Sequence, residues 1–281
     1  MTPASHVLEK LAGFWSNLQF DNWAFILVQR LLARRLPLVV FKKGKLVLVV
    51  DYDANDQNGI RHCLSSRMYR RYLRHLDKQQ PLTVLDLGGN TGGFLCCVLD
   101  AGYSFAKAVT VEMNPNTFAR LSFNMKYNGL GSVTPINAAV FTRQGTIEIQ
   151  NSKGNPGQSI YSQFSPELAV TVPTITFDEI VAGHFPNDDR ALDLVKIDIE
   201  GVEYEILESD TCTQLRRFKH LIIEIHQLPN RDATSLISRI QSFGFDNETD
   251  RDAVEKDVYY FRNRALVNQT VAANFVAQHA P

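Results

Sequence analysis

Ionisable side chains occupy alternate positions in two apolar stretches towards the C-terminal end of the chain. Lys196 and Asp198 alternate with apolar residues in the first stretch, and Glu224 and His226 do so in the second. A strand places alternate side chains on one face, and central parallel strands are normally apolar on both faces, so these charges need partners. We therefore expect Lys196 to pair with Glu224 inside the sheet. Asp198 and His226 would then emerge at the carboxyl-end edge, where open α/β sheets bind ligands.

A glycine-rich turn interrupts the segment 83–94. An apolar run leads through Asp86 into the turn, and a helical pattern follows, which predicts a strand, a tight loop and a helix. Glycine lets the backbone approach a bulky ligand because it has no Cβ atom. A dinucleotide fingerprint requires glycine at the third position of G-x-G-x-x-G, where this chain has Asn90, so a dehydrogenase is disfavoured. The spacing resembles instead the first motif of S-adenosylmethionine (AdoMet) methyltransferases, which here consists of Asp86, Gly88, Asn90 and Gly92.

An acidic residue at the end of the next predicted strand is placed to bind ribose. This strand covers 106–111 and ends at Glu112. An acid about twenty residues beyond a glycine-rich turn can accept hydrogen bonds from two ribose hydroxyls. The third predicted strand, 133–137, ends in Asn137 and Ala138, and side chains of this size are suited to covering or bonding an adenine.

Composition limits the classes of function. With 281 residues, of which 44% are apolar and 21% charged, the chain can bury a full core as one α/β domain with an N-terminal extension. A net charge of -1 provides no general basic field, so we expect no nucleic-acid partner. The four cysteines have no metal-binding spacing, which indicates reduced core residues of a cytoplasmic protein. No cleavable signal is visible, and no apolar run reaches the roughly 18 residues that span a bilayer.

Three regions divide the chain. We expect residues 1–80 to form an extension of helices and a β-hairpin, residues 81–264 the main α/β domain, and residues 265–281 a tail. The first helices are rich in Trp and Phe, and such helices pack on their own domain or on a second subunit more often than on a membrane. The segment 61–78 is expected as one helix, because apolar residues repeat every four positions at Leu64, Met68, Tyr72 and Leu76. Its arginines form either a solvated face or a rim that steers an acidic substrate. A polar, glycine-rich loop at 151–161 is either a mobile connection or a lid.

The motifs of residues 82–262, taken together, match one family. The most specific is Lys196-Ile-Asp198-Ile-Glu200-Gly201-x-Glu203; the others are Glu112 with Asn114-Pro115, Leu121 with Asn124, Asn137-Ala138-Ala139, and Glu224 with His226. They are similar to those of the FkbM family of AdoMet-dependent methyltransferases, from which Met113 departs because the family often has proline there. The resemblance implies a Rossmann-like class I methyltransferase fold, with a seven-stranded, mostly parallel sheet whose last strand is antiparallel.

The resemblance also implies transfer of a methyl group from AdoMet to a hydroxyl of a sugar, glycan or secondary metabolite. The protein must then hold the acceptor oxygen and remove its proton, and we expect His226 or Asp198, alone or as a pair, to be the general base. Glu200 completes the candidate catalytic set. A divalent-metal version, with Glu224 as a third ligand, conflicts with a Lys196–Glu224 pair, so no metal is expected. Cofactor contacts are expected from Asp86, Gly88, Gly89, Asn90, Thr91, Gly92, Glu112, Met113, Asn137, Ala138 and Asp198.

Three alternatives remain open. An ion-pair network with a purely structural role would explain the charged strands without catalysis. A non-catalytic binding module that keeps the fold would have no use for Glu112 or for the pair of Asp198 and His226. Methyl transfer to a non-hydroxyl acceptor is the third alternative, although the order Asp-Ile-Glu-Gly at the strand end lacks the Asn/Asp-Pro-Pro-aromatic motif of N-methyltransferases that act on bases or glutamine.

Overall fold

The computed structural model describes residues 15–32, 36–150, 166–186, 190–250, 252 and 257–269. Within these residues, no helix is both long enough and apolar enough to cross a membrane. Three expectations fall wholly or partly outside them: the helix expected near the N-terminus, the loop at 151–161, and the tail beyond residue 269.

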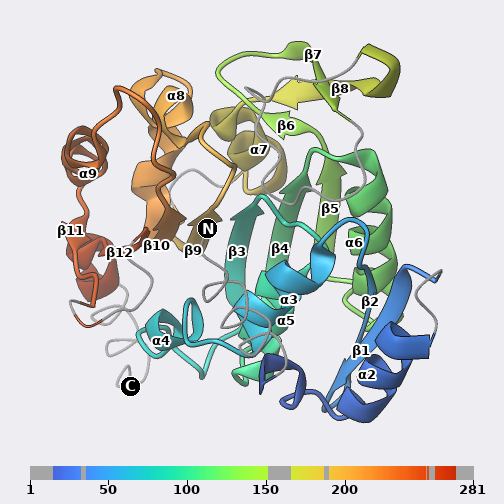
Figure 1. Ribbon diagram of the computed structural model, residues 1–281. Helices are drawn as coiled ribbons and strands as arrows, with labels where there is room; N and C mark the ends of the chain where they lie inside the picture. The colour runs from blue at the N-terminus through green and yellow to red at the C-terminus, as the bar shows by residue number, and fades with distance from the viewer. Residues whose placement is uncertain are drawn as a thin grey trace.

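A seven-stranded sheet forms the centre of the molecule (Figure 1). Its strands are β3 (Leu82–Leu87), β4 (Phe105–Glu112), β5 (Val133–Asn137), β9 (Leu192–Ile197), β10 (Phe218–Glu224), β11 (Asp246–Asn247) and β12 (Val258–Arg262). They lie in the order β11-β12-β10-β9-β3-β4-β5, and β12 runs antiparallel to both of its neighbours while the other pairs are parallel. The last strand of the sheet in the chain is therefore the antiparallel one, which confirms the predicted fold class.

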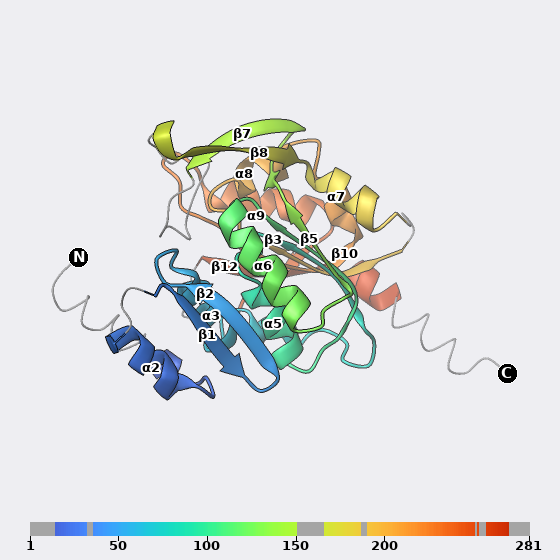
Figure 2. The same ribbon diagram turned by 90° about the vertical axis from the view of Figure 1, so that its right-hand side faces the viewer.

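Helices cover both faces of this sheet, as Figure 2 shows. On one face lie α5 (Gly93–Asp100) and α6 (Pro115–Tyr127), and on the other lie α7 (Phe177–His184), α8 (Glu203–Glu208) and α9 (Ala233–Ser242). Strand residues alternate between the two cores, since Val84 and Ile222 pack on the α5 side while Leu85 and Ile223 pack on the α7 side. Because both faces are buried, these strands are almost continuously apolar.

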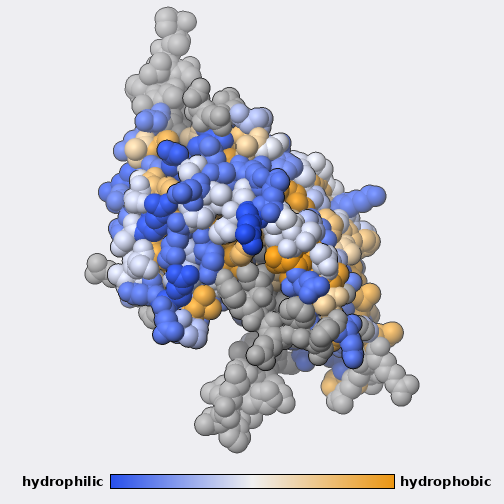
Figure 3. All heavy atoms as spheres, turned by 90° about the horizontal axis from the view of Figure 1, so that it is seen from above, coloured by the Kyte–Doolittle hydropathy of each residue, from blue (hydrophilic) through white to orange (hydrophobic). Residues whose placement is uncertain are grey.

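A smaller three-stranded sheet lies near the end at which the parallel strands finish (Figure 1). It consists of β6 (Ala139–Val140), β7 (Gly145–Gln150) and β8 (Ala169–Ile175), in the order β6-β8-β7. The surface seen from above this end is mainly hydrophilic, with hydrophobic side chains in small groups (Figure 3). A ligand that approaches from this side therefore meets a largely polar surface.

The first described elements form a layer outside α6 (Figure 2). They are α2 (Trp23–Leu32) and an antiparallel hairpin of β1 (Leu38–Lys43) and β2 (Leu46–Asp51), which confirms the predicted hairpin. The buried side chain of Asn124 accepts a hydrogen bond from Val49 N at 2.8 Å, and it donates to Val49 O and Thr91 O at 3.0 and 2.9 Å. One amide on α6 thus fastens the hairpin to the turn that follows β3.

Large apolar side chains are exposed along α2. Phe25, Val28 and Leu31 are 56%, 51% and 68% exposed. Exposed apolar groups of this kind are typical of a contact surface, and a homo-oligomer remains a prediction.

The segment 61–78 is not the single helix that we expected. It contains the end of α3 (Asp56–Leu64) and one separate turn, α4 (Arg70–Leu73). The break lies at Ser66, whose hydroxyl donates to His62 O and accepts a hydrogen bond from Met68 N. Serine competes with the backbone for hydrogen bonds in this way, which favours a turn. The spacing nonetheless identified the buried face, whose members are at most 7% exposed: Leu64, Met68, Tyr72 and Leu76.

We expect Asn124→Ala to lower the free energy of unfolding by about 3 kcal/mol, because the backbone groups that Asn124 holds lose their partners. Urea denaturation of the variant and the wild type measures this difference. The control is Asn128→Ala, which removes two similar hydrogen bonds to Val47 at a partly exposed position and should have a markedly smaller effect. Equal losses in the two variants would contradict the special role of Asn124.

Candidate active site

The glycine-rich turn joins β3 to α5 and packs closely on β9. Gly88 and Gly92 have positive φ angles of 77° and 93°, and Asn90 has one of 47°. A Cβ atom on Gly88 would lie 1.7 Å from the backbone oxygen of Asp198, so a larger residue does not fit there. The turn therefore brings its own backbone directly against the end of β9.

A buried lysine on β9 holds this turn in place. Lys196 is 3% exposed, and its ammonium group donates to Leu87 O and Gly88 O at 3.2 and 2.7 Å. The same Nζ atom lies 3.4 Å from Asp86 Oδ1 and 3.3 Å from Asp198 Oδ2. Burial alone would lower the pKa of Lys196, but the carboxylates of Asp198 and Asp86 raise it above its usual value. Lys196 is therefore a permanent cation under the turn.

The expected pair of Lys196 and Glu224 does not form. The register of β9 and β10 places Lys196 beside Ile222. Glu224 therefore lies level with the first residue beyond the end of β9. Glu224 Oε2 lies instead 3.3 Å from the hydroxyl of Tyr69. The alternation of charged and apolar residues predicted which side chains share a face of each strand. It did not predict the register between the two strands, which decides which of these side chains become neighbours.

Glu112, at the end of β4, lines a cavity of about 510 Å³. Its carboxylate accepts hydrogen bonds from Asn90 N at 2.9 Å and from Asn114 N at 2.8 Å. Burial raises the pKa of Glu112 to about 7, although these two hydrogen bonds oppose the shift. The cavity has the size of a small-molecule site, which is roughly 300–1,000 Å³. Other predicted cofactor residues that line it are Gly88, Asn90, Met113, Ala138 and Asp198.

A second cavity, of about 240 Å³, shares part of its wall with the first. Four residues line both: Gly88, Asn90, Asp198 and Glu200. Glu200 has a positive φ angle of 58°, which is rare for a residue other than glycine, and such strain is found preferentially at functional sites. Gly89, Lys196 and Glu224 line the second cavity and not the first. The two spaces therefore meet at a pair of carboxylates.

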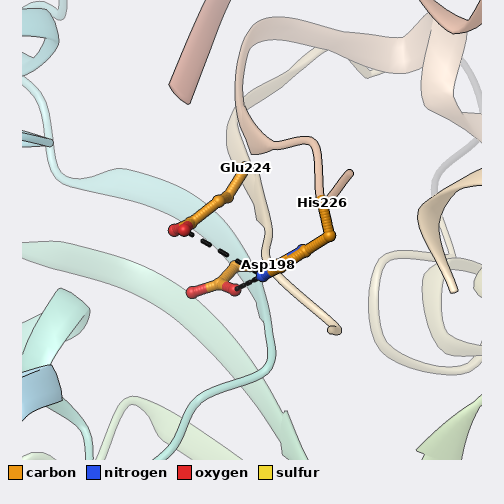
Figure 4. Close-up of side chains that lie close together, drawn as sticks. All are labelled: Asp198, Glu224 and His226. Carbon is orange, nitrogen blue, oxygen red and sulfur yellow. Dashed lines mark ion pairs between the residues drawn. The ribbon is translucent and has the colours of Figure 1, made fainter. Parts of the chain in front are cut away.

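His226 lies among carboxylates near the ends of β9 and β10, three members of the group being drawn in Figure 4. Its Nε2 atom is 3.2 Å from Glu200 Oε2, 3.9 Å from Asp198 Oδ1 and 4.0 Å from Glu224 Oε1, and its Nδ1 atom is 3.0 Å from Glu203 Oε1. Burial would lower the pKa of His226, but hydrogen bonds to Glu200 and Glu203 raise it to about 11. Burial and the charge of Asp198 raise the pKa of Glu224 to about 7. These hydrogen bonds stabilise the protonated form of His226, and the choice of His226 or a carboxylate as general base stays a prediction.

Several residues that were predicted to contact the cofactor do not line either cavity, but lie next to residues that do. Those that line neither cavity are Asp86, Thr91, Gly92 and Asn137. Asp86 is fully buried, where it accepts a hydrogen bond from the Thr110 hydroxyl at 3.1 Å. The amide of Asn137 donates to the backbone oxygens of Glu112 and Met113 at 2.8 and 3.0 Å. These residues fix the turn and the end of β4.

Sequence reasoning missed residues of the N-terminal region that complete the cavities. They include Asp51 and Asp56 in the first cavity, and Asn58, His62 and Tyr69 in the second. Tyr69 is the most informative, because its hydroxyl lies 3.2 Å from Asp198 Oδ2 as well as near Glu224. No motif marks a tyrosine in an amphipathic segment, so only the packing of that segment on the sheet reveals its place.

The sheet order, the antiparallel β12, the turn after β3 and the acid at the end of β4 define a Rossmann-like methyltransferase. Comparison with protein families agrees, since the family described as "Methyltransferase FkbM domain" matches residues 86–247. This match covers more than half of the chain. The chain therefore belongs to the FkbM methyltransferase family and is an enzyme.

One curated protein and two solved structures illustrate what this chain is similar to. Hexuronic acid methyltransferase AglP of Haloferax volcanii is 32% identical over 155 residues, which are 54% of this chain and 60% of that protein, so the match spans less than two thirds of the relative. A solved FkbM methyltransferase from Methylobacillus flagellatus KT gives a TM-score of 0.43 at 15% identity, over 86% of this chain and 60% of that one. TrmK of M. capricolum, solved with S-adenosyl-homocysteine, gives a TM-score of 0.39 at 14% identity, over 72% and 68% of the two chains.

We expect Lys196→Gln to lower the free energy of unfolding by about 3–5 kcal/mol, because buried carboxylates lose their cation. Guanidinium denaturation measures the change. The matched control is Lys219→Gln, which removes a partly exposed ion pair with Asp193 of 2.8 Å. That change should cost at most about 1 kcal/mol. Similar values for the two variants would argue against Lys196 as the group that holds the turn.

Proposed function

We propose that this enzyme transfers a methyl group from AdoMet to a hydroxyl group of a sugar or glycan. The observation that carries the proposal is the junction of the two cavities, where Asp198 and Glu200 border both spaces. Such a junction suits a reaction in which a cofactor and an acceptor meet in a fixed orientation. A relative named as a hexuronic acid methyltransferase supports a sugar as the acceptor.

The lining of the first cavity supports AdoMet as the methyl donor. Each oxygen of the Glu112 carboxylate accepts one backbone hydrogen bond and has capacity for another, so the group can bind both ribose hydroxyls. Met113 and Ala138 border the same cavity and offer apolar contact to an adenine. Gly88 and Asn90 would face the amino-acid end. When bound, AdoMet supplies an electrophilic methyl group on its sulfonium.

The second cavity is assigned to the acceptor. Asp198 and Glu200 can accept a hydrogen bond from a sugar hydroxyl, which orients its oxygen towards the first cavity. One of these carboxylates then takes the hydroxyl proton as the oxygen is methylated. His226 holds Glu200 through Nε2 and is itself held by Glu203 through Nδ1. The carboxylates thus perform the proton transfer, and the imidazole positions them.

Membership of the family supports an enzyme rather than a non-catalytic binding module. A non-hydroxyl acceptor remains as the second candidate, because a hexuronic acid carries a carboxylate as well as hydroxyls. Like charges repel, so the carboxylates around His226 disfavour a carboxylate acceptor. Treatment with mild alkali distinguishes the two possible products. It hydrolyses the methyl ester formed at a carboxylate and leaves the methyl ether formed at a hydroxyl intact.

We expect the affinity for S-adenosylhomocysteine to increase with pH through about 7, the pKa to which burial raises Glu112. Ribose hydroxyls donate to the ionised carboxylate, so binding is lost as the pH falls and the group takes up a proton. One proton changes the affinity by at most about tenfold per pH unit. Calorimetric titrations at several pH values measure the slope.

Glu112→Gln provides the control for this titration, because the amide has no proton to take up in the same range. The variant should bind more weakly and with a flatter pH dependence. A wild-type slope that the variant reproduces would exclude Glu112 as its origin. A folded wild-type protein that binds no S-adenosylhomocysteine at any pH would overturn the proposed function.

We expect turnover to fall in Asp198→Asn and Glu200→Gln, and in at least one of them by about 10²–10⁴-fold, the usual contribution of a general base. The rate is measured as S-adenosylhomocysteine released with uronic-acid-containing glycans as acceptors. Glu208→Gln is the control, because Glu208 is an exposed carboxylate that pairs with Arg231. Near-normal turnover in both active-site variants would remove the carboxylates as proton acceptors.

A further inference from the structure

Three side chains of the acidic cluster direct one potential ligand atom each towards a common point. The ligand atoms of Asp198, Glu224 and His226 all lie within 4.8 Å of one another. Figure 4 shows these side chains pointing towards each other from the ends of β9 and β10. Two ligands of one divalent cation are at most about 4–5 Å apart, because each bond is about 2.0–2.6 Å long. The spacing therefore fits a single cation.

Neighbouring groups fix the two carboxylates in the orientation that a cation needs. Asp198 Oδ2 is 3.3 Å from Lys196 Nζ and 3.2 Å from the Tyr69 hydroxyl, while Oδ1 faces His226. Glu224 Oε2 is 3.3 Å from the same hydroxyl, while Oε1 faces His226. Each carboxylate is thus held by its outer oxygen and presents the inner one.

The imidazole has the outer partner that metal-binding histidines usually have. Its Nδ1 atom is hydrogen-bonded to Glu203, whose side chain is 0% exposed. Within the described part of the chain, the second oxygen of Glu203 has no hydrogen-bond partner. A carboxylate behind a histidine fixes the ring so that the other nitrogen faces the metal. Here that nitrogen is Nε2, which faces the inner oxygens of Asp198 and Glu224.

The cluster also lacks positive charge. Five carboxyl groups, those of Asp86, Asp198, Glu200, Glu203 and Glu224, surround two cationic groups, Lys196 and His226. Charges that are withdrawn from water without partners destabilise a protein. The sulfonium of AdoMet would offset one of the excess charges. A divalent cation would add two positive charges, one of which replaces the proton that His226 releases on binding, so the cation would offset one more.

We propose that Asp198, Glu224 and His226 bind a divalent cation of the Mg²⁺ or Mn²⁺ type at the wall of the second cavity. The two carboxylates suit either ion, and the imidazole favours Mn²⁺ over Mg²⁺ because nitrogen ligands suit transition metals better than hard cations. In the structure Glu200 accepts a hydrogen bond from His226 Nε2. Binding of the cation would release the Nε2 proton to solvent, so that Glu200 would lose this hydrogen bond and become able to accept another. The role of the cation rests on the proposed function: it would bind the acceptor hydroxyl and make it more acidic, and Glu200 would take the proton.

Titration with Mn²⁺ tests the site without cofactor or acceptor. The protein is first treated with EDTA and dialysed, and the signal of free Mn²⁺ is then followed by electron paramagnetic resonance. We expect saturable binding of one ion per chain, weakened at least about tenfold in Glu224→Gln and in Glu203→Gln. Glu208→Gln, at an exposed carboxylate outside the cluster, should bind as the wild type does.

Two results would overturn the site: no saturable binding of Mn²⁺ by the folded wild type at millimolar concentration, or wild-type affinity in Glu224→Gln. The first needs no variant, so a failure of Glu224→Gln to fold leaves the test intact. S-adenosylhomocysteine binding by the same EDTA-treated sample separates this inference from the proposed function. If the nucleoside binds and Mn²⁺ does not, only the cation site is wrong. If Mn²⁺ binds and the nucleoside does not, the site stands and the proposed function fails.

Discussion

The buried ammonium group of Lys196 is the interaction on which the rest of the site depends. It donates to the backbone of the turn through Gly88 O, and it lies between Asp86 beneath the turn and Asp198 at the cavity wall. A charge in the interior is tolerated only when all of these partners are in place. The relative positions of β3, β9 and the turn are therefore tightly constrained, and the place of Asp198 between the two cavities follows from them.

Local sequence patterns predicted much of the fold. The strand expected at 133–137 is β5, and the hairpin near the N-terminus is present. Both could be predicted because a strand or hairpin is indicated by an apolar run and the turn residues next to it. The number of strands and the antiparallel direction of the last one came from the family resemblance. The prediction of one helix at 61–78 was wrong. The spacing of apolar residues indicates which side chains face the core, but it does not indicate whether the backbone hydrogen bonds of a helix continue past Ser66.

The site could be predicted where a residue belongs to its own motif. Glu112 and Gly88 line the first cavity because a strand end and a turn fix their positions. The predicted partner of Lys196 was wrong. Its observed partners depend on the register between β9 and β10 and on the glycine-rich turn that follows β3. Tyr69 was missed for a similar reason, since it reaches Asp198 and Glu224 only after the N-terminal region has packed on the sheet.

The pairing of β3 with β9 also constrains the order of folding. Thr83 and Asp193 are hydrogen-bonded neighbours at the start of these strands, although they are 110 residues apart in the chain. Contacts of such long range form slowly, because a long loop must close before they contribute any stability. While the chain emerges from the ribosome, β3 and its turn have no lysine beneath them until β9 has been made. The turn that organises the enzyme is thus synthesised early and reaches its final shape late.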